Sequence, residues 1–198
     1  MQTSTIKNVV SSSIAIVVLT AVFGFGYPLL MTGIAQVAFR HQADGSLVKV
    51  NGKVVGSELA AQEFKSPRYF HSRPSGVAYN AGGTSFANLG PTNPDLAKAV
   101  GDQAKAILKL EGPYNPGLTV HDIPVDAVTT SASGIDPDIS PANAKLQSRR
   151  IAAVRHLPLA TVQKLIRQNT DSRSLGFFGE PGINVLKLNI ALDKESTK

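Results

Sequence analysis

The chain has 198 residues, with 20 Lys and Arg against 14 Asp and Glu, a net charge of +6 and no cysteine. The lack of cysteine excludes disulfides and thiolate metal sites. The basic residues are spread along the chain, and only Arg149 and Arg150 are adjacent. Because no polybasic patch and no binding motif accompanies this charge, the composition does not indicate a nucleic-acid partner.

A long uncharged segment lies near the amino terminus. No Asp, Glu, Lys, Arg or His occurs in the 32 positions between Lys7 and Arg40, and its most apolar part, residues 14–31, has 18 residues. About 20 apolar residues in a helix cross a hydrocarbon layer of about 30 Å. A charge in that layer costs about 2.5–3.5 kcal/mol on insertion scales. We therefore predict a short tail over residues 1–7 and a transmembrane anchor helix over residues 8–39, with the lipid bilayer as one partner.

A cleaved signal peptide is the alternative for this segment. Residues 33–35 (Gly-Ile-Ala) offer a small-x-small cleavage site. The apolar run is longer than the 7–15 residues that are usual in signal peptides, which favours the anchor. Lys7 lies on one side of the span and Arg40 and Lys49 lie on the other. The positive-inside rule therefore leaves the orientation open.

Two features interrupt the uniformity of the predicted span. Ser13, Thr20 and Gly24 are spaced by seven and four, which places them on one helical face. Small residues on one face allow another helix to approach closely, although small residues are also common in spans without this role. Pro28 cannot donate to the carbonyl of Gly24, so we expect a kink near this position unless the helix ends there.

The remaining residues, 40–198, have a length that suits one soluble domain with its own core. Asn51-Gly52 between two short apolar runs predicts a hairpin near 47–55. Asn93-Pro94 and Ser140-Pro141 each combine a cap residue with Pro at the first helical position. The predicted elements are a short helix over 57–61, a long loop over 65–92, helices near 93–111, 140–156 and 158–169, and short strands over 125–129 and 183–190.

A helix fits the last of these segments as well, because residues 185, 188 and 192 share a helical face, so strand or helix stays open over 183–192. Helices and short strands without β-α-β alternation predict an α+β domain.

The sequence carries no recognisable catalytic motif. The four histidines (His41, His71, His121 and His156) are scattered without a metal-binding spacing, and no phosphate-binding P-loop occurs. The paired acids Asp136 and Asp138 flank a proline, as turn residues often do. We therefore expect that the chain is not an enzyme by itself, with no catalytic residue, no metal and no firmly bound cofactor.

Several segments taken together resemble one family. They are residues 27–30 (YPLL), 44–47 (DGSL), 56–59 (GSEL) with Gln62 and Phe64, 69–75 (YFHSRPS), 87–94 (ANLGPTNP), 124–137 (PVDAVTTSASGIDP) and 185–193 (VLKLNIALD). In this order they are similar to the C subunit of the Kdp-type bacterial potassium-transporting P-type ATPase. Each segment is short, but the ordered set is specific.

The resemblance implies a role within a complex. The partners would be a channel-like potassium-binding subunit, a P-type ATPase subunit and a small membrane subunit, and the complex would import potassium at the expense of ATP. ATP and potassium would belong to that complex. The resemblance also implies a single-pass protein of the bacterial inner membrane with its soluble domain outside the cytoplasm, and an accessory role in assembly.

The family has also been described as a catalytic chaperone that raises the affinity of the ATPase subunit for ATP through a Gly-Gly loop. The corresponding nucleotide-binding candidates are Gly82, Gly83, Thr84 and Ser85. Backbone N–H groups of such a loop can form an anion-binding nest. A Gly-rich turn without a ligand is the alternative, which we favour because glycine's usual role is conformational. The side of the membrane on which the domain lies distinguishes a nucleotide-binding loop from a turn without a ligand, because an outward-facing domain does not meet cytoplasmic ATP.

The long loop over 65–92 is the candidate docking surface. Aromatic and Arg side chains carry most of the binding energy when an interface buries them. We predict the partner interface at Tyr69, Phe70, Arg73, Tyr79 and Asn88. The alternative is that the aromatic rings anchor the loop onto the core of its own domain.

Overall fold

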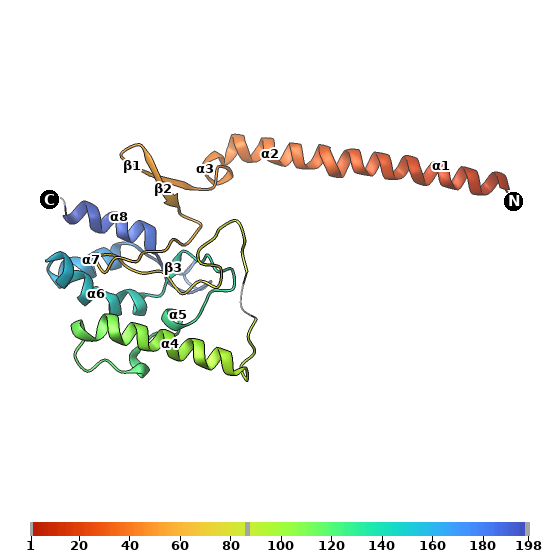
Figure 1. Cartoon of the computed structure of the whole chain (residues 1–198). Helices are drawn as coiled ribbons and strands as arrows, with labels where there is room; N and C mark the ends of the chain where they lie inside the picture. The colour runs from red at the N-terminus through yellow and green to blue at the C-terminus, as the bar shows by residue number, and fades with distance from the viewer. Residues whose placement is uncertain (1, 86–87, 197–198) are drawn as a thin grey trace. The chain divides into compact units, whose positions relative to one another are not determined.

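The computed structural model describes residues 2–85 and 88–196, and the chain divides into two compact units between Leu47 and Val48. The first unit contains α1 (Gln2–Leu19), the π-helix η1 (Thr20–Gly26), α2 (Tyr27–Ala38) and α3 (Arg40–Ala43). Helices and short strands make up the second unit, an α+β domain (Figure 1). The fold class is therefore an apolar N-terminal helix followed by a mixed soluble domain.

In the first unit, Ser4–Ala38 form one helical run of 35 residues that is long and apolar enough to cross a membrane. At a rise of 1.5 Å per residue the run is roughly 50 Å long, which exceeds the hydrocarbon thickness of about 30 Å. None of the side chains in its most apolar stretch is buried within the chain. The described residues contain this one candidate span.

A π-helix lies directly before Pro28. The Tyr27 N–H donates to the carbonyl of Val22, five residues earlier. Proline crowds the carbonyl four residues before it and offers no N–H, so a wider turn at this point relieves the helix. A Cβ placed on Gly24 would lie 3.6 Å from Thr20 Cγ2. Thr20 and Gly24 are therefore neighbours on the helix surface.

A hairpin of β1 (Leu47–Val50) and β2 (Lys53–Ser57) follows, and all of it except Leu47 belongs to the second unit. Asn51 and Gly52 form its turn with φ of 51° and 78°, the positive values that this turn requires. The short helix predicted over 57–61 is wrong, because β2 continues through Ser57. A turn follows, in which the Ser57 hydroxyl accepts from the Leu59 N–H at 3.1 Å and so competes with a helix start.

The residues described between 58 and 93 form turns and irregular chain without a helix or strand. Positions 86 and 87 of the predicted loop lie outside the described residues. The helices that follow are α4 (Pro94–Glu111), η2 (Gly112–Tyr114), η3 (Val120–Asp122), α5 (Val125–Val128), α6 (Pro141–Arg155), α7 (Leu159–Gln168) and α8 (Val185–Ser196). Asn93 and Ser140 cap α4 and α6 by accepting from the N–H groups of Asp95 and Asn143.

The strand predicted over 125–129 is wrong, because α5 occupies it. Pro124 starts the turn, and the Thr129 hydroxyl donates to the Val125 carbonyl at 2.8 Å. Asp126 on this turn accepts from the Ser140 N–H at 2.8 Å and from its hydroxyl. These contacts join α5 to the start of α6 and outweigh the β-propensity of the valines.

A small antiparallel sheet joins distant parts of the domain. Its strands are β3 (Asp138–Ile139), β4 (Thr170–Asp171) and β5 (Gly182–Asn184), with β5 in the centre. Ile183 pairs with Ile139 on one side and with Thr170 on the other. Ile183 and Ile139 are almost fully buried, so the sheet lies in the domain core.

The strand predicted over 183–190 is confined to β5 and ends at Asn184. The Asn184 carboxamide accepts from the Lys187 N–H at 3.1 Å and so starts helix α8. Val185, Leu188 and Leu192, spaced by three and four, are buried against the core. Residues 186–192 are therefore helical, although their alternating apolar pattern also fits a strand.

The main core lies among α6, α7, α8 and the sheet. Its buried members are Phe70, Ile139, Ala144, Ile151, Ala152, Val162, Leu165, Ile166, Ile183, Val185, Leu188 and Leu192. A second, smaller cluster of Ala104, Ile123 and Ala127 joins α4 to α5. Phe70 is the member that comes from the long irregular segment, which shows that this segment takes part in the core.

Candidate functional site

Arg150 on α6 is fully buried and holds the backbone of the irregular segment near residues 67–69 by hydrogen bonds. Its Nε donates to Glu111 Oε1 on α4 at 2.7 Å, and Nη2 donates to Gln147 Oε1 at 2.9 Å. Nη1 donates to the carbonyls of Tyr69, at 3.0 Å, and Pro67. One guanidinium thus joins two helices and the backbone at 67–69.

The next two residues are held by side-chain amides. Asn189 on α8 accepts from the Phe70 N–H at 2.9 Å and donates to the Phe70 carbonyl at 3.0 Å. Gln147 makes the same pair of bonds with the backbone of His71, at 2.8 and 3.1 Å. The two amides replace the neighbours that a strand would have in a sheet. Phe70 is fully buried and its ring belongs to the core, as the alternative of an aromatic anchor within the domain expects; the partner interface itself stays a prediction.

Arg155, one helical turn further along α6, holds the preceding residues. Its Nε donates to the Arg68 carbonyl and its Nη2 to Asp193 Oδ1, both at 2.7 Å. The guanidinium lies over the Tyr69 ring at 4.8 Å, and the Tyr69 hydroxyl donates to Asp193 Oδ2 at 3.1 Å. The ring and the hydroxyl of Tyr69 therefore both make contacts within the domain.

The other predicted interface residues divide into two groups. Arg73 is half-buried and pairs with Asp136 at 2.9 Å, while the Tyr79 hydroxyl donates to the Arg73 carbonyl at 2.9 Å. Asn88 is exposed. The structure thus brings Tyr69, Phe70, Arg73 and Tyr79 into contacts with their own domain and leaves Asn88 on the surface.

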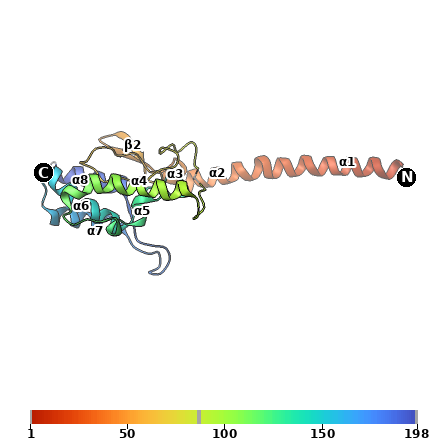
Figure 2. The ribbon, with the colours of Figure 1, turned by 60° about the horizontal axis from the view of Figure 1, so that its bottom comes forward.

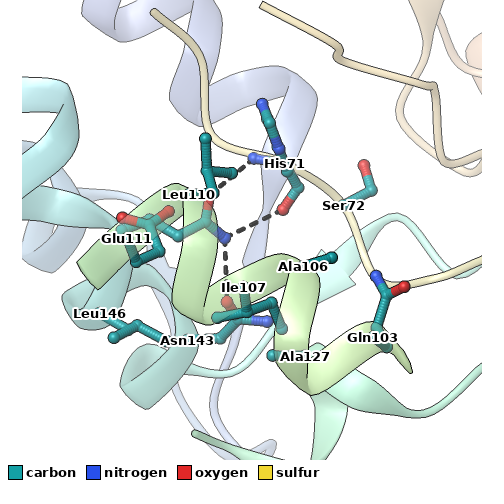
Figure 3. Close-up of a pocket in the computed structure, with 11 residues that line it drawn as sticks. His71, Ser72, Gln103, Ala106, Ile107, Leu110, Glu111, Ala127, Asn143 and Leu146 are labelled. Atoms are coloured by element: carbon teal, nitrogen blue, oxygen red, sulfur yellow. Dashed lines mark hydrogen bonds between the residues drawn. The ribbon is translucent and has the colours of Figure 1, made fainter. Parts of the chain in front are cut away.

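A cavity of about 170 Å³ lies between α4, α6 and the segment at 71–72 (Figure 3). Its lining residues are His71, Ser72, Gln103, Ala106, Ile107, Leu110, Glu111, Ala127, Asn143, Leu146 and Gln147. The side-chain amide of Gln147 donates to the His71 carbonyl at 3.1 Å and to Asn143 Oδ1 at 2.9 Å. The parts of the chain that the structure describes contain no group of three His, Cys, Asp or Glu placed to hold a metal.

Burial sets the electrostatics of this region. Desolvation raises the pKa of Glu111, although the ion pair with Arg150 opposes the shift. The second carboxylate oxygen of Glu111, Oε2, has no hydrogen-bond partner among the described residues. Desolvation also lowers the pKa of His71; the hydrogen bond to the Ser66 carbonyl opposes this shift, and the charge of Arg150 adds to it.

The lowered pKa of His71 predicts a loss of stability in mild acid. Between the folded pKa and the ordinary value of 6.5, the unfolded chain binds more protons than the folded chain, so stability falls as the pH is lowered through this window. We expect His71→Asn to reduce the slope of unfolding midpoint against pH between pH 7.5 and 5.5. The matched control is His121→Asn, the same substitution at an exposed position outside the buried cluster. Equal slopes for wild type and His71→Asn would contradict the prediction.

The candidate nucleotide-binding residues 82–85 are exposed. The Gly82 N–H donates to Asn80 Oδ1 at 3.0 Å, and the Gly83 N–H donates to the Asn80 carbonyl at 3.1 Å. Both glycine donors are therefore used within the loop. The contacts of Gly82 and Gly83 do not favour nucleotide binding at this loop, and the nucleotide-binding hypothesis stays a prediction.

No motif or spacing in the sequence indicates the roles of Glu111, Asn143, Gln147, Arg150, Arg155 and Asn189. These residues come from three helices that are far apart along the chain, and each has an ordinary surface character in its own sequence window. Neighbouring residues on a helix point in directions about 100° apart, so the adjacent arginines at 149 and 150 were a weak signal that the two side chains lie in different surroundings.

Comparison with known proteins agrees with the ordered motifs. The family described as KdpC, K⁺-transporting ATPase c chain, matches residues 9–194. A potassium-transporting ATPase KdpC subunit of Sorangium cellulosum is 50% identical over 183 residues, covering 91% of this chain and 94% of that protein. Those of Methylococcus capsulatus and Bradyrhizobium diazoefficiens are 48% and 44% identical, covering 90% and 98% of this chain and 93% and 100% of theirs. Since the match includes both the apolar helix and the α+β domain, the chain belongs to the KdpC family, the c chain of K⁺-transporting ATPases.

Proposed function

We propose that this chain is the non-catalytic, membrane-anchored accessory subunit of an ATP-driven potassium import complex. Its role is to stabilise the assembly of a channel-like potassium-binding subunit, a P-type ATPase subunit and a small membrane subunit. The observation that carries this proposal is the family match over residues 9–194, which includes most of the candidate span. ATP hydrolysis and potassium binding belong to the other subunits.

The geometry supports a binding role. The polar side chains of the α+β domain are used to fix its own backbone, as Arg150, Gln147 and Asn189 do. A domain fixed in this way offers a rigid surface, which lowers the entropy cost of docking. We further propose that the domain lies outside the cytoplasm, and that the face with Ser13, Thr20 and Gly24 packs against a helix of another subunit.

The test compares the complex purified with and without this subunit. We expect deletion to abolish growth at limiting potassium and to reduce the yield of intact complex in detergent. Gly24→Leu should reduce the yield in part, because a bulky side chain blocks close helix approach. Val22→Leu, on another face of the same helical turn, is the matched control and should assemble normally. An intact and fully active complex without the chain would refute the proposal.

A topology reporter fused after Lys198 tests the location separately. We expect an external reading. A cytoplasmic reading would overturn the proposed location and return the Gly82-Gly83 loop to consideration as a nucleotide contact. In that case, ATP titration of the ATPase subunit with wild-type and Gly83→Val chains would show whether the loop changes the apparent affinity for ATP.

A further inference from the structure

The connection between β4 and β5 is a loop that projects from the domain and is closed at its base by an ion pair and backbone hydrogen bonds. It covers residues 172–181 and is the bluish loop that projects from the second unit in Figure 2. Both of its ends lie in the same antiparallel sheet. At its base Arg173 pairs with Glu180 at 2.6 Å. Ser174 and Phe178 exchange backbone hydrogen bonds, each at 2.9 Å. We call residues 174–179 the β4–β5 tip.

The β4–β5 tip exposes three large apolar side chains. Leu175, Phe177 and Phe178 are 83%, 65% and 58% exposed. The two rings contact each other, with centroids 4.1 Å apart. No other aromatic ring among the described residues of the α+β domain is exposed. A contiguous exposed apolar group of this kind marks an interaction site.

The backbone of the tip holds these side chains in a fixed arrangement. Leu175, Gly176 and Gly179 have positive φ of 53°, 83° and 77°. Leucine disfavours this conformation, so the hydrogen bonds and the ion pair at the base must maintain it. A preformed loop loses little conformational entropy when it binds, which favours its use as a docking element.

The charges around the tip favour a protein partner over lipid. Residues 174–179 carry no charge, and Arg173 and Glu180 pair with each other. Amphipathic segments that bind at a membrane surface usually present basic residues to anionic headgroups. The tip carries no charge and its rim is neutralised by the Arg173–Glu180 pair, so its phenylalanines fit an apolar recess with a polar edge, the usual surroundings of an aromatic anchor in a protein interface.

We propose that the β4–β5 tip inserts into an apolar recess on another protein subunit of the same ATPase, with Phe177 and Phe178 as anchors. The proposal rests on the proposed function, because membership of a complex requires a covered surface on this chain. It also moves the expected docking surface away from the segment 65–92, in which the side chains of Tyr69, Phe70, Arg73 and Tyr79 make contacts within the domain.

The test is the double variant Phe177→Ser/Phe178→Ser in the full complex. We expect at least a tenfold loss of co-purification with the other subunits, at an unchanged melting temperature of the isolated full-length chain, because both rings are exposed. The matched control is Val120→Ser/Val125→Ser, at two apolar residues that are 55% and 73% exposed elsewhere on the domain. The control should assemble as wild type does.

A photo-reactive phenylalanine analogue in place of Phe177 identifies the occupant. We expect a crosslink to one other subunit, and a crosslink to lipid or to a second copy of this chain would overturn the proposal. The double variant and the deletion together distinguish a failure of this inference from a failure of the proposed function. If deletion of the chain disrupts the complex but the double variant assembles normally, the docking inference alone fails. If deletion has no effect, the proposed function fails first.

Discussion

Replacement of Arg150 by Met is expected to lower the stability of the α+β domain strongly, because its guanidinium is buried and fully bonded. The substitution removes the partner of Glu111, which is 2% exposed, and leaves the carbonyls of Pro67 and Tyr69 without their donor. Breaking a buried ion pair by removing one partner costs about 3–5 kcal/mol. For a domain of this size that corresponds to a fall of roughly 6–20 °C in melting temperature.

The neighbouring residue provides the control. Arg149 is exposed on the same helix, so Arg149→Met should change stability by no more than about 0.5 kcal/mol. The measurement is thermal unfolding of the full-length chain in detergent, followed by circular dichroism. Adding Glu111→Leu to Arg150→Met should recover part of the loss, because no unpaired carboxylate then remains buried. A melting temperature of Arg150→Met equal to that of Arg149→Met would show that the buried pair does not hold the domain together.

Replacement of Gly134 by Ala is expected to displace the segment that packs against it. Gly134 has φ of +73°, and a Cβ there would lie 2.7 Å from Val77 Cγ2 and 2.9 Å from the Ser85 carbonyl. The left-handed conformation costs a residue with a side chain about 1–2 kcal/mol. The steric overlap adds about 1–3 kcal/mol, because the Ser85 contact is with backbone.

Gly117→Ala isolates the steric part of this effect. Gly117 has φ of +81°, and a Cβ there would meet nothing within 4 Å. The variant should therefore show the conformational cost alone. Comparison of the two unfolding free energies gives the cost of the contact with residues 77 and 85. If both variants lose the same stability, the close approach at Gly134 has no energetic weight, and the adjoining loop is free to move away.

The elements that local chemistry controls were visible in the sequence. Asn51-Gly52 supplies two positive-φ positions, and the structure has a hairpin turn there. Asn93-Pro94 and Ser140-Pro141 lie where α4 and α6 begin. The uncharged run before Arg40 forms the candidate span. In each case a few adjacent residues determine the outcome, so no knowledge of distant contacts is needed.

The sequence could not show what depends on contacts between distant segments. The pattern from Ile183 to Leu192 fits a strand or a helix, and the Asn184 cap with packing of Leu188 into the core decides for a helix. The sequence predicts Phe70 as an interface residue, because nothing near it in the chain indicates the hydrogen bonds to Asn189, which lies 119 positions away. The sequence analysis singles out nothing in the β4–β5 tip, because the exposure of its rings depends on the sheet at its base.

The hydrogen bonds between the side-chain amides of Asn189 and Gln147 and the backbone of Phe70 and His71 have a consequence for backbone dynamics. In a segment without secondary structure, amide hydrogens usually exchange with solvent quickly. The N–H groups of Phe70 and His71 instead donate to Asn189 and Gln147, which are buried in the core. Their deuterium uptake should therefore be as slow as that of α6 and α8, whereas uptake at the exposed residues 82–85 should be fast. Within one irregular stretch, the opening free energy would thus range from that of the whole domain to almost zero.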